Sequence, residues 1–327
     1  MSCVLSTVVE TFQPLTYRAL MHATELEAVV MGRVCVDLYP MQLRVPLEQV
    51  EGFHKYVGGF AGNVATGLAR LGVRTAIVSA VGDDGHGRYV RDWLTAQGVD
   101  CRWLGTHPTL RTALAFCEAW PPDNFPITFY RTPTCPDWEL TVSSLDLEAL
   151  AAVPLAYVSG TGFAIEPSRL ATQSLLEARA GGTATTVLDL DWRDVLWDDP
   201  VDYAACMRDA ARNADVALGS DEELAAAVGA PDASRLLDLG VGVVANKHGG
   251  RGVTLYVAGH EPVVVPPHPV EVVNGLGAGD AFAAAFGWRL LRGDQPAAAA
   301  AVANRAGAHV AARLGCSIAM PTEGDLS

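Results

Sequence analysis

The sequence predicts an α/β protein with a mostly parallel central sheet, helices on both of its faces, and a small antiparallel lid. From Leu26, short apolar runs alternate with amphipathic stretches, as in LEAVVMGRV, NVATGLARLG and TAIVSAVG, which is the pattern of βαβ units. The pattern resumes between LAYVSG and VGVVANKHG, where glycines follow the helical stretches. Continuous apolar runs are typical of strands that are buried on both faces of a parallel sheet.

Two stretches, residues 37–57 and 101–131, interrupt this alternation. They are rich in Tyr, Phe, Thr, Val and Pro, and TALAFCEAW and ITFYR alternate as antiparallel strands do. We interpret them as the strands of the lid. Near the end of the chain, the Ala-rich stretches Asp280 to Arg292 and Gln295 to Ala312 predict two helices. No internal repeat or linker divides residues 25–327, so we expect one domain, preceded by a flexible extension over residues 1–24.

The composition narrows the class of function. The formal net charge of -14 and the pI of about 4.9 disfavour nucleic-acid and anionic-membrane partners, which reward clustered Lys and Arg. The seven cysteines form no C-x-x-C pair, which favours reduced thiols over disulfides or zinc. Without a leader pattern or an apolar run of about 18 residues, we expect a cytoplasmic protein. An anionic metabolite would need a local basic pocket.

The strongest motif is Gly277-Ala278-Gly279-Asp280, where a strand and loop lead into a long helix. Small residues allow a close approach of the backbone, and the free N–H groups of a helix N-terminus form an anion site. A phosphate bound there would place Asp280 where it could accept a proton from a substrate hydroxyl. The motif alone is equally compatible with a helix N-cap behind a flexible glycine turn.

Three further segments carry polar groups that could bind a ligand. Gly58, Gly59 and Asn63 introduce an Ala/Gly-rich helix, although helix packing and an N-cap explain them equally well. Asp37 follows the first strand, at the edge where open α/β sheets bind ligands, and could also be a turn aspartate. In Asp189-Leu190-Asp191-Trp192-Arg193, alternation sends the charged residues to one side, although a surface salt-bridged turn is the simpler reading.

Lys247 is one of only two lysines, and it begins the pattern Lys247-x-Gly249-x-x-Gly252 after an apolar run. It could contact a phosphate, or it could be a solvated loop lysine. Neither lysine follows a glycine, which excludes a Walker loop, and the glycines of residues 58–62 lack the G-x-G-x-x-G spacing of dinucleotide folds.

Taken in order, these segments resemble the ribokinase-like carbohydrate kinases, the pfkB family, from about Glu27 to Thr322. VGGFAGNVATGLARLG is similar to the N-terminal signature of the family, and NGLGAGDAFAAAFGWRL to the C-terminal one. The resemblance implies the three-layer ribokinase-like fold and ATP-dependent phosphorylation of a sugar hydroxyl. Because exposed lid strands commonly need a partner that covers their edges, a homodimer joined through the lids is a hypothesis.

The resemblance also implies roles for individual residues. Asp280 becomes the catalytic base, and the amides of Gly277, Ala278 and Gly279 form the anion hole. Sugar hydroxyls would be bound by Asp37, Gly58, Gly59 and Asn63. The nucleotide would lie along Lys247, Gly249, Gly252 and Asn304. Mg²⁺ would arrive with ATP, held mainly by phosphates and water, and Glu222 remains from the family's N-x-x-E pattern to influence it.

Several stretches, including GRVCVDLYP, FPITFYR and LDLDWR, resemble the branch of the family that phosphorylates sugar acids. The resemblance implies that Arg131 and Arg193 hold a carboxylate. The expected substrate is 5-dehydro-2-deoxy-D-gluconate, an intermediate of myo-inositol breakdown, phosphorylated at its terminal hydroxyl. The alternatives are 2-keto-3-deoxygluconate, a neutral sugar such as fructose or ribose, or a catalytically silent sugar-binding regulator.

The sequence departs from the family pattern in places. Asn274-Gly275 stands where Asp-Thr is frequent, which removes a carboxylate associated with a monovalent cation and argues against potassium activation. Asp191 replaces a common Asn, and Asp194 follows Arg193 where proline is frequent.

Overall fold

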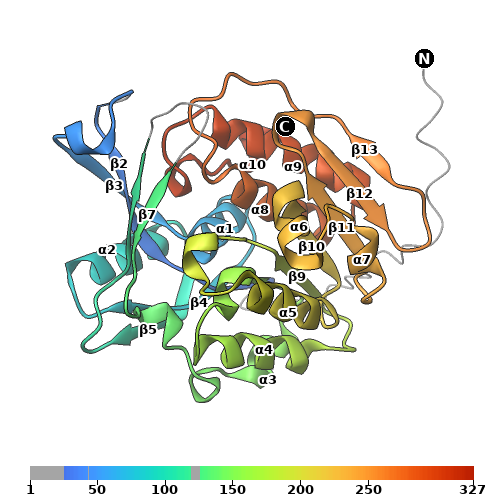
Figure 1. Cartoon of the computed structure of the whole chain (residues 1–327), viewed down its shortest axis with the longest axis horizontal. Coiled ribbons are helices and arrows are strands. Elements are labelled where there is room, and N and C mark those ends of the chain that lie inside the picture. The colour runs from blue at the N-terminus through green and yellow to red at the C-terminus, as the bar shows by residue number, and fades with distance from the viewer. Residues whose placement is uncertain (1–25, 43, 119–125) are drawn as a thin grey trace.

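The computed structural model describes residues 26–42, 44–118 and 126–327, so the predicted flexible extension lies outside the described residues. A large sheet forms the centre of the molecule, with helices on both faces, and a small sheet projects at one side (Figure 1). This arrangement confirms the predicted three-layer α/β fold with a lid.

The large sheet has nine strands in the order β13-β12-β11-β10-β9-β8-β1-β4-β5. All neighbours from β11 to β5 are parallel, and β12 and β13 are antiparallel at one edge. The parallel strands are β1 (Ala28–Met31), β4 (Thr75–Gly82), β5 (Asp100–His107), β8 (Leu155–Ser159), β9 (Thr185–Asp189), β10 (Val216–Ser220) and β11 (Val243–Lys247). The edge strands are β12 (Val253–Val257) and β13 (Val263–Val265).

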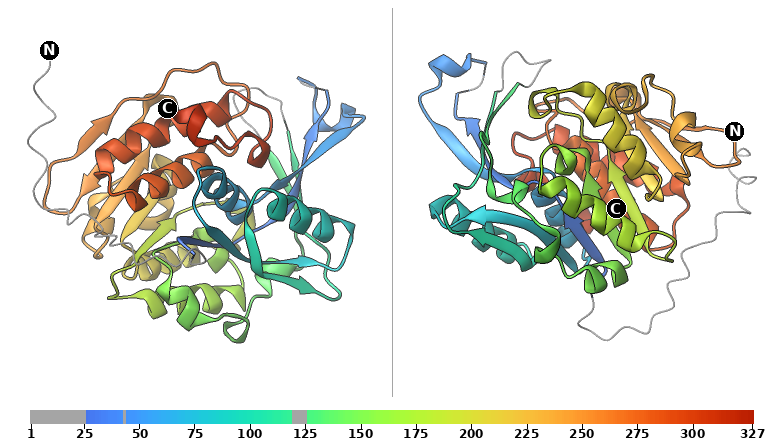
Figure 2. Two further views of the ribbon diagram at one scale, coloured as in Figure 1. Left: turned by 180° about the vertical axis from the view of Figure 1, so that it is seen from behind. Right: turned by 60° about the horizontal axis from the view of Figure 1, so that its bottom comes forward.

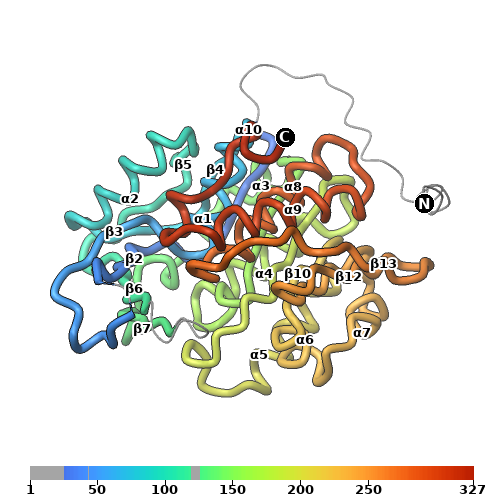
Figure 3. Tube along the Cα trace, turned by 90° about the horizontal axis from the view of Figure 1, so that it is seen from above, coloured from blue at the N-terminus to red at the C-terminus, as the bar shows by residue number. Residues whose placement is uncertain are grey.

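The strands are apolar throughout because both faces of the sheet are covered. Ala28 and Val30 belong to one core, whereas Val29 and Met31 belong to the other. The first core is covered by α1 (Phe60–Arg70), α2 (Gly85–Ala96), α8 (Ala278–Leu291), α9 (Pro296–Ala311) and α10 (Glu323–Leu326). The second is covered by α3 (Leu147–Ala152), α4 (Ser168–Arg179), α5 (Pro200–Ala211), α6 (Asp221–Val228) and α7 (Ser234–Leu237). Figures 2 and 3 show α8 and α9 on one side of the sheet and α6 and α7 on the other.

The helices α1 and α8 pack closely because their facing residues are small. A Cβ added to Gly67 of α1 would lie 2.7 Å from the Cβ of Ala284 in α8. This close contact fixes the two helices relative to each other, and their N-terminal ends meet at the edge where the parallel strands end. The predicted Ala-rich helices therefore correspond to α8 and α9, and they position the site described below.

The small sheet has the strand order β3-β2-β6-β7, with β2 (Cys35–Pro40), β3 (Phe53–Gly58), β6 (Leu114–Cys117) and β7 (Ile127–Tyr130). Both outer pairings are antiparallel, while β2 and β6 run parallel. The first part of the predicted lid stretch 101–131 belongs elsewhere, because β5 pairs with β4 as the edge of the large sheet. As an edge strand, β5 carries partly exposed polar residues, and this explains its lid-like composition.

Within the described ranges, no helix combines the length and the apolar character that crossing a bilayer requires. The six cysteines in this part of the chain are free thiols. Four of them are buried, and three of those, Cys35, Cys117 and Cys316, line the pocket beneath the lid.

Candidate active site

The residues predicted to form an anion hole lie in the turn into α8. Gly277 caps the helix with φ of 80°, a left-handed conformation that favours glycine, and a Cβ at this position would lie 2.7 Å from the Cβ of Cys316. The first amides of a helix have no partner within the helix, and the N–H of Ala278 makes only a long bond of 3.4 Å to the carbonyl oxygen of Gly275. The N–H groups at the start of α8 can therefore turn to a ligand. The structure therefore supports an anion site at this turn rather than a turn of flexible glycines.

Asp280 lies in the first turn of α8 and faces the pocket beneath the lid. Asn63 of α1 donates from Nδ2 to Oδ2 of Asp280 over 2.7 Å, which fixes the carboxylate. Burial raises the pKa of Asp280 to about 6, and the negative charge of Asp191 adds to this rise. A carboxylate with a raised pKa is a stronger base, as proton abstraction from a hydroxyl requires.

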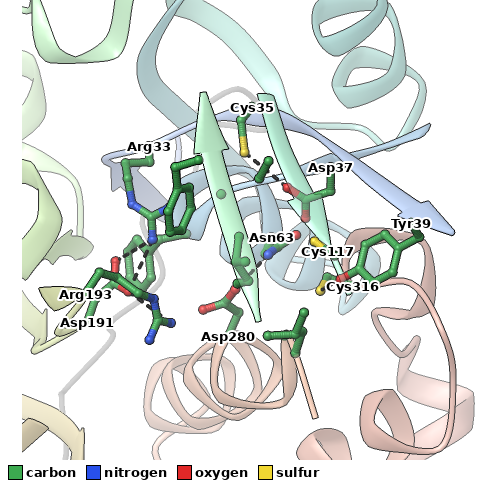
Figure 4. A pocket seen from close by; sticks show the side chains of 17 residues that line it. Arg33, Cys35, Asp37, Tyr39, Asn63, Cys117, Asp191, Arg193, Asp280 and Cys316 are labelled. Carbon is green, nitrogen blue, oxygen red and sulfur yellow. Dashed lines mark hydrogen bonds and ion pairs between the residues drawn. The ribbon is translucent and has the colours of Figure 1, made fainter. Parts of the chain in front are cut away.

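The pocket next to Asp280 lies between the lid and the main body. Lid strands contribute Asp37, Tyr39, Ala115, Cys117, Ile127 and Phe129. The main body contributes residues including Arg33, Asn63, Asp191, Arg193, Gly277, Asp280 and Cys316. In Figure 4 the arginines and Asp191 are grouped on one side, Asp37 and Tyr39 lie on the other, and Asn63 and Asp280 lie between them. The lining is polar at both ends, as a hydroxyl-rich ligand requires.

Asp37 comes from β2 and is buried in the pocket wall. The thiol of Cys35 donates to Oδ1 of Asp37 over 3.2 Å, and burial raises the pKa of this carboxyl to about 6. Gly58 leaves the necessary space, because a Cβ there would fall 2.0 Å from the carboxylate carbon of Asp37. Gly59 also lines the pocket and caps α1. The structure thus brings together the four residues predicted to bind the sugar, namely Asp37, Gly58, Gly59 and Asn63.

The basic end of the pocket is an ion-pair cluster of Arg33, Asp191 and Arg193. Arg33 Nη2 lies 2.9 Å from Oδ2 of Asp191, and Arg193 Nη2 lies 3.3 Å from Oδ1 of the same carboxylate. Although burial favours the neutral form, the two guanidinium groups lower the pKa of Asp191 overall. The sequence analysis found Arg193 but missed Arg33. The signal available in the sequence was the position of Arg33 two residues after the first strand and four residues before Asp37.

Arg131, predicted to hold a carboxylate, is not among the residues that line the pocket. Its Nη2 donates to the buried carboxylate of Asp137, and its guanidinium carbon lies 4.3 Å from the centre of the Trp138 ring. Its Nε and Nη1 are buried and have no hydrogen-bond partner among the described residues, so two donors remain open. The role of Arg131 toward a carboxylate therefore stays a prediction.

A second cleft lies on the other side of the anion-hole turn. It is lined by Ala278 and Gly279 of the turn and by all four residues predicted to contact a nucleotide, namely Lys247, Gly249, Gly252 and Asn304. Phe282, Val270, Val272, Ala308 and Ala311 give it an apolar wall suited to a base. Because Gly277 and Asp280 line the first pocket, the turn separates the two sites and can contact ligands in both.

Lys247 points toward the anion-hole turn, since a Cβ added to Gly279 would lie 3.5 Å from its Nζ. The same Nζ lies 3.3 Å from Oδ2 of Asp189. Burial lowers the pKa of Lys247, but the charges of Asp189, Glu223 and Asp280 raise it overall, so the ammonium stays charged. Asp189 thus pairs with Lys247, whereas Asp191 and Arg193 line the pocket beneath the lid. The three side chains do not share one orientation as expected, because β9 ends at Asp189 and the strand alternation stops there.

Glu222, predicted to influence the metal, is exposed at the start of α6 and does not line the cleft. Its neighbour Glu223 does, with Oε2 accepting from the backbone N–H of Ser220 over 2.7 Å. The described residues contain no group of three or more His, Cys, Asp or Glu side chains that could hold a metal ion. Glu223 alone could not hold a metal ion. It could contact a Mg²⁺ ion that takes most of its ligands from phosphates and water.

Two clefts that meet at a helix N-terminus, with a buried carboxylate in one of them, are the arrangement expected of a phosphotransferase. Residues 25–323 match the model of the pfkB family carbohydrate kinases. The chain belongs to this family, which makes it an ATP-dependent sugar kinase with the ribokinase-like fold.

Its similarity to individual proteins covers most of the chain. It is 31% identical to the 5-dehydro-2-deoxygluconokinase of Clostridium tetani, over 90% of each chain. It is 33% identical to the protein of the same name from Geobacillus kaustophilus, over 91% of each chain. The structure of a Vibrio cholerae O395 fructokinase with fructose, ADP and calcium superposes with a TM-score of 0.81 at 26% identity, covering 92% of this chain and 98% of that one.

Proposed function

We propose that this kinase transfers the γ-phosphoryl group of ATP to the terminal hydroxyl of a sugar acid, 5-dehydro-2-deoxy-D-gluconate. The observation that carries the proposal is the basic end of the sugar pocket, where two guanidinium groups face one carboxylate in a protein of net charge -14. A neutral sugar offers nothing to balance this charge. The names of the relatives from Clostridium tetani and Geobacillus kaustophilus support the same substrate.

The geometry suggests how the residues divide the reaction. The substrate hydroxyl gives its proton to Asp280 as its oxygen attacks the γ-phosphorus, and the bond to the β-phosphate oxygen breaks to release ADP. The amides of Gly277, Ala278 and Gly279, together with Lys247, stabilise the charge on the moving phosphoryl group. Mg²⁺ bound to the nucleotide would neutralise phosphate charge. Asp37 and Asn63 orient the sugar through its hydroxyls.

The alternatives differ in what they require of the pocket. A neutral-sugar kinase needs Asp37, Asn63 and Asp280 but not the arginines. A kinase for 2-keto-3-deoxygluconate would use the same basic end, so only a direct comparison of substrates separates it from our proposal. A silent sugar-binding protein has no need of Asp280 fixed next to an open anion site.

ATP consumption with Mg²⁺, measured against a panel of acceptors, tests the proposal. The panel contains 5-dehydro-2-deoxygluconate, 2-keto-3-deoxygluconate, fructose, ribose and adenosine. We expect the first to give the highest kcat/KM, because its carboxylate balances the basic end and its terminal hydroxyl reaches Asp280. A clear preference for fructose or ribose would reject the acid substrate while leaving the kinase assignment intact, and no turnover with any acceptor would favour the silent protein.

We also propose that two copies pair through their lids. The lid face turned away from the pocket carries an aromatic cluster of Phe53, Phe116 and Tyr130, with ring centres 5.2 Å apart in both pairs, and Tyr130 is 61% exposed. An uncovered sheet face of this kind favours a partner. Sedimentation should show a dimer that Tyr130→Asp dissociates, whereas Val201→Asp, at a 70% exposed position on α5, should not. A monomeric wild-type protein would reject the pairing.

A further inference from the structure

Arg33 is held rigidly at the basic end of the sugar pocket. It follows the C-terminal end of β1, and its side chain is only 7% exposed. Nε donates to Oγ1 of Thr161 over 2.7 Å, and Nη2 donates to both carboxylate oxygens of Asp191, at 2.9 and 3.2 Å. These three bonds fix both the position and the plane of the guanidinium group.

One nitrogen of this guanidinium is left for a ligand. Among the described residues, Nη1 of Arg33 has no hydrogen-bond partner, although Arg33 lines the pocket. Asn63, which is also buried and lines the same pocket, has an unpaired Oδ1. An unpaired donor on a pocket-lining arginine and a buried, unpaired acceptor in the same pocket indicate that a polar ligand completes both.

The charges at this end indicate the chemistry of that ligand. Arg33 and Arg193 together carry two positive charges, whereas Asp191 between them carries one negative charge. The other pocket carboxylates, Asp37 and Asp280, lie across the pocket in Figure 4, and the charge of Arg33 acts on both of them without direct contact. Because only one carboxylate contacts the two guanidinium groups, an incoming carboxylate would be stabilised here.

The two arginines are not equivalent. The Arg193 side chain is 41% exposed, so water screens its charge, and its single contact with Asp191 is longer. Arg33 is buried, has three bonds to its partners, and lies under the lid, with its guanidinium carbon 5.7 Å from the centre of the Phe129 ring. A fixed and desolvated cation binds a carboxylate with less loss of side-chain entropy than a mobile one.

We infer that Arg33 is the residue that selects acid substrates: its Nη1 donates to the substrate carboxylate, while Asp191 and Thr161 hold the guanidinium in place. Arg193 gives weaker support from the solvent side. This assignment rests on the proposed sugar-acid kinase function and names the atom that reads the acid group. It also places the substrate, with its carboxylate at Arg33 and its terminal hydroxyl at Asp280.

The test pairs a change in the enzyme with a change in the substrate. Wild type, Arg33→Gln, Arg193→Gln and Arg131→Gln are assayed with 5-dehydro-2-deoxygluconate and with its carboxamide, which keeps every hydroxyl but lacks the charge. We expect Arg33→Gln to lower kcat/KM for the acid by roughly 10- to 100-fold, as the loss of a charge-assisted hydrogen bond predicts, and to change the value for the amide by less than about threefold. Arg193→Gln should show a smaller loss specific to the acid, and Arg131→Gln should affect both substrates alike.

Two measurements separate substrate recognition from a structural role. ADP binding by calorimetry reports folding through the other cleft and should be unchanged in Arg33→Gln. Should that variant not fold, Arg33→Lys, which keeps the charge but not the fixed fork, replaces it, with a smaller loss that is again confined to the acid. Equal losses for acid and amide, or a larger acid-specific loss in Arg193→Gln or Arg131→Gln, would overturn the assignment to Arg33 alone. A wild-type enzyme that prefers the amide would overturn the proposed function as well.

Discussion

Asp280→Asn should lower kcat by at least about 10²-fold, the lower range for loss of a general base, while leaving the binding of sugar acid and ATP within a few fold. Asn has the same shape as Asp, keeps the contact with Asn63 within reach, and suits the first turn of α8, so the fold should be unaltered by circular dichroism. What is lost is the oxygen that accepts the proton. Rapid-quench or steady-state turnover measures the effect.

The pH profile gives this prediction a second readout. Burial raises the pKa of Asp280 and that of Asp37 to about 6, above the usual value for Asp, so both are charged above pH 6 and protonated below it. A base works only when deprotonated, so wild-type kcat/KM should fall as the pH drops through about 6. In Asp280→Asn, the residual kcat/KM should depend less on pH, because only the protonation of Asp37 can still lower it near pH 6.

A matched control lies just beyond the same helix. Asp294, just after α8, pairs with Arg289 away from both clefts, and Asp294→Asn should keep normal turnover. Near-normal kcat in Asp280→Asn, or an unchanged pH profile, would remove Asp280 from the role of base.

Gly277→Ala should lower kcat by roughly 10²- to 10³-fold, the range for a misplaced oxyanion-type donor. Ala at this position must adopt φ of 80°, and its Cβ would lie 2.7 Å from that of Cys316. The turn can accommodate the methyl group only by shifting, and this moves the amides that face the phosphoryl group. The effect should appear mainly in kcat, because the turn forms only part of each binding cleft.

Gly293 offers a control for backbone strain alone. It follows α8 at its other end with φ of 86°, and a Cβ there meets nothing within 4 Å. Gly293→Ala should therefore have a similar strain and a similar loss of thermal stability but normal turnover. Comparable activity in Gly277→Ala and Gly293→Ala would show that the position of the turn does not limit catalysis.

Much of the fold follows from patterns that single segments carry. The sequence predicts β8 to β11 because strands buried on both faces consist of continuous apolar residues. It predicts α8 and α9 because closely packed helices are rich in alanine. The strand β5 was assigned to the lid because an edge strand is partly polar, as lid strands are. Its membership in the large sheet depends on its pairing with β4, which composition does not encode.

The site was predicted where function requires a particular residue at a particular turn. Gly277, Asp280, Lys247 and Asn63 stand in motifs whose spacing fixes their place at helix or strand ends. The positions of the arginine side chains were harder to predict. An arginine side chain is long, and its orientation depends on the carboxylate with which it pairs. Arg131 was matched by a short pattern, and the structure places it outside the pocket lining with one nitrogen paired to Asp137. Arg33 stands in the stretch GRVCVDLYP, but its proposed role depends on Asp191 and Thr161, more than a hundred residues away in the chain.

Phosphorus NMR of the product tests the central claim most directly. ATP, Mg²⁺ and equal amounts of 5-dehydro-2-deoxygluconate and fructose are incubated with the enzyme in one vessel. We expect a single new phosphate monoester, coupled to the two protons of a terminal CH₂ group and carried by the acid. Fructose phosphate as the main product, phosphate on another hydroxyl of the acid, or inorganic phosphate alone would contradict a sugar-acid kinase that places a terminal hydroxyl at Asp280.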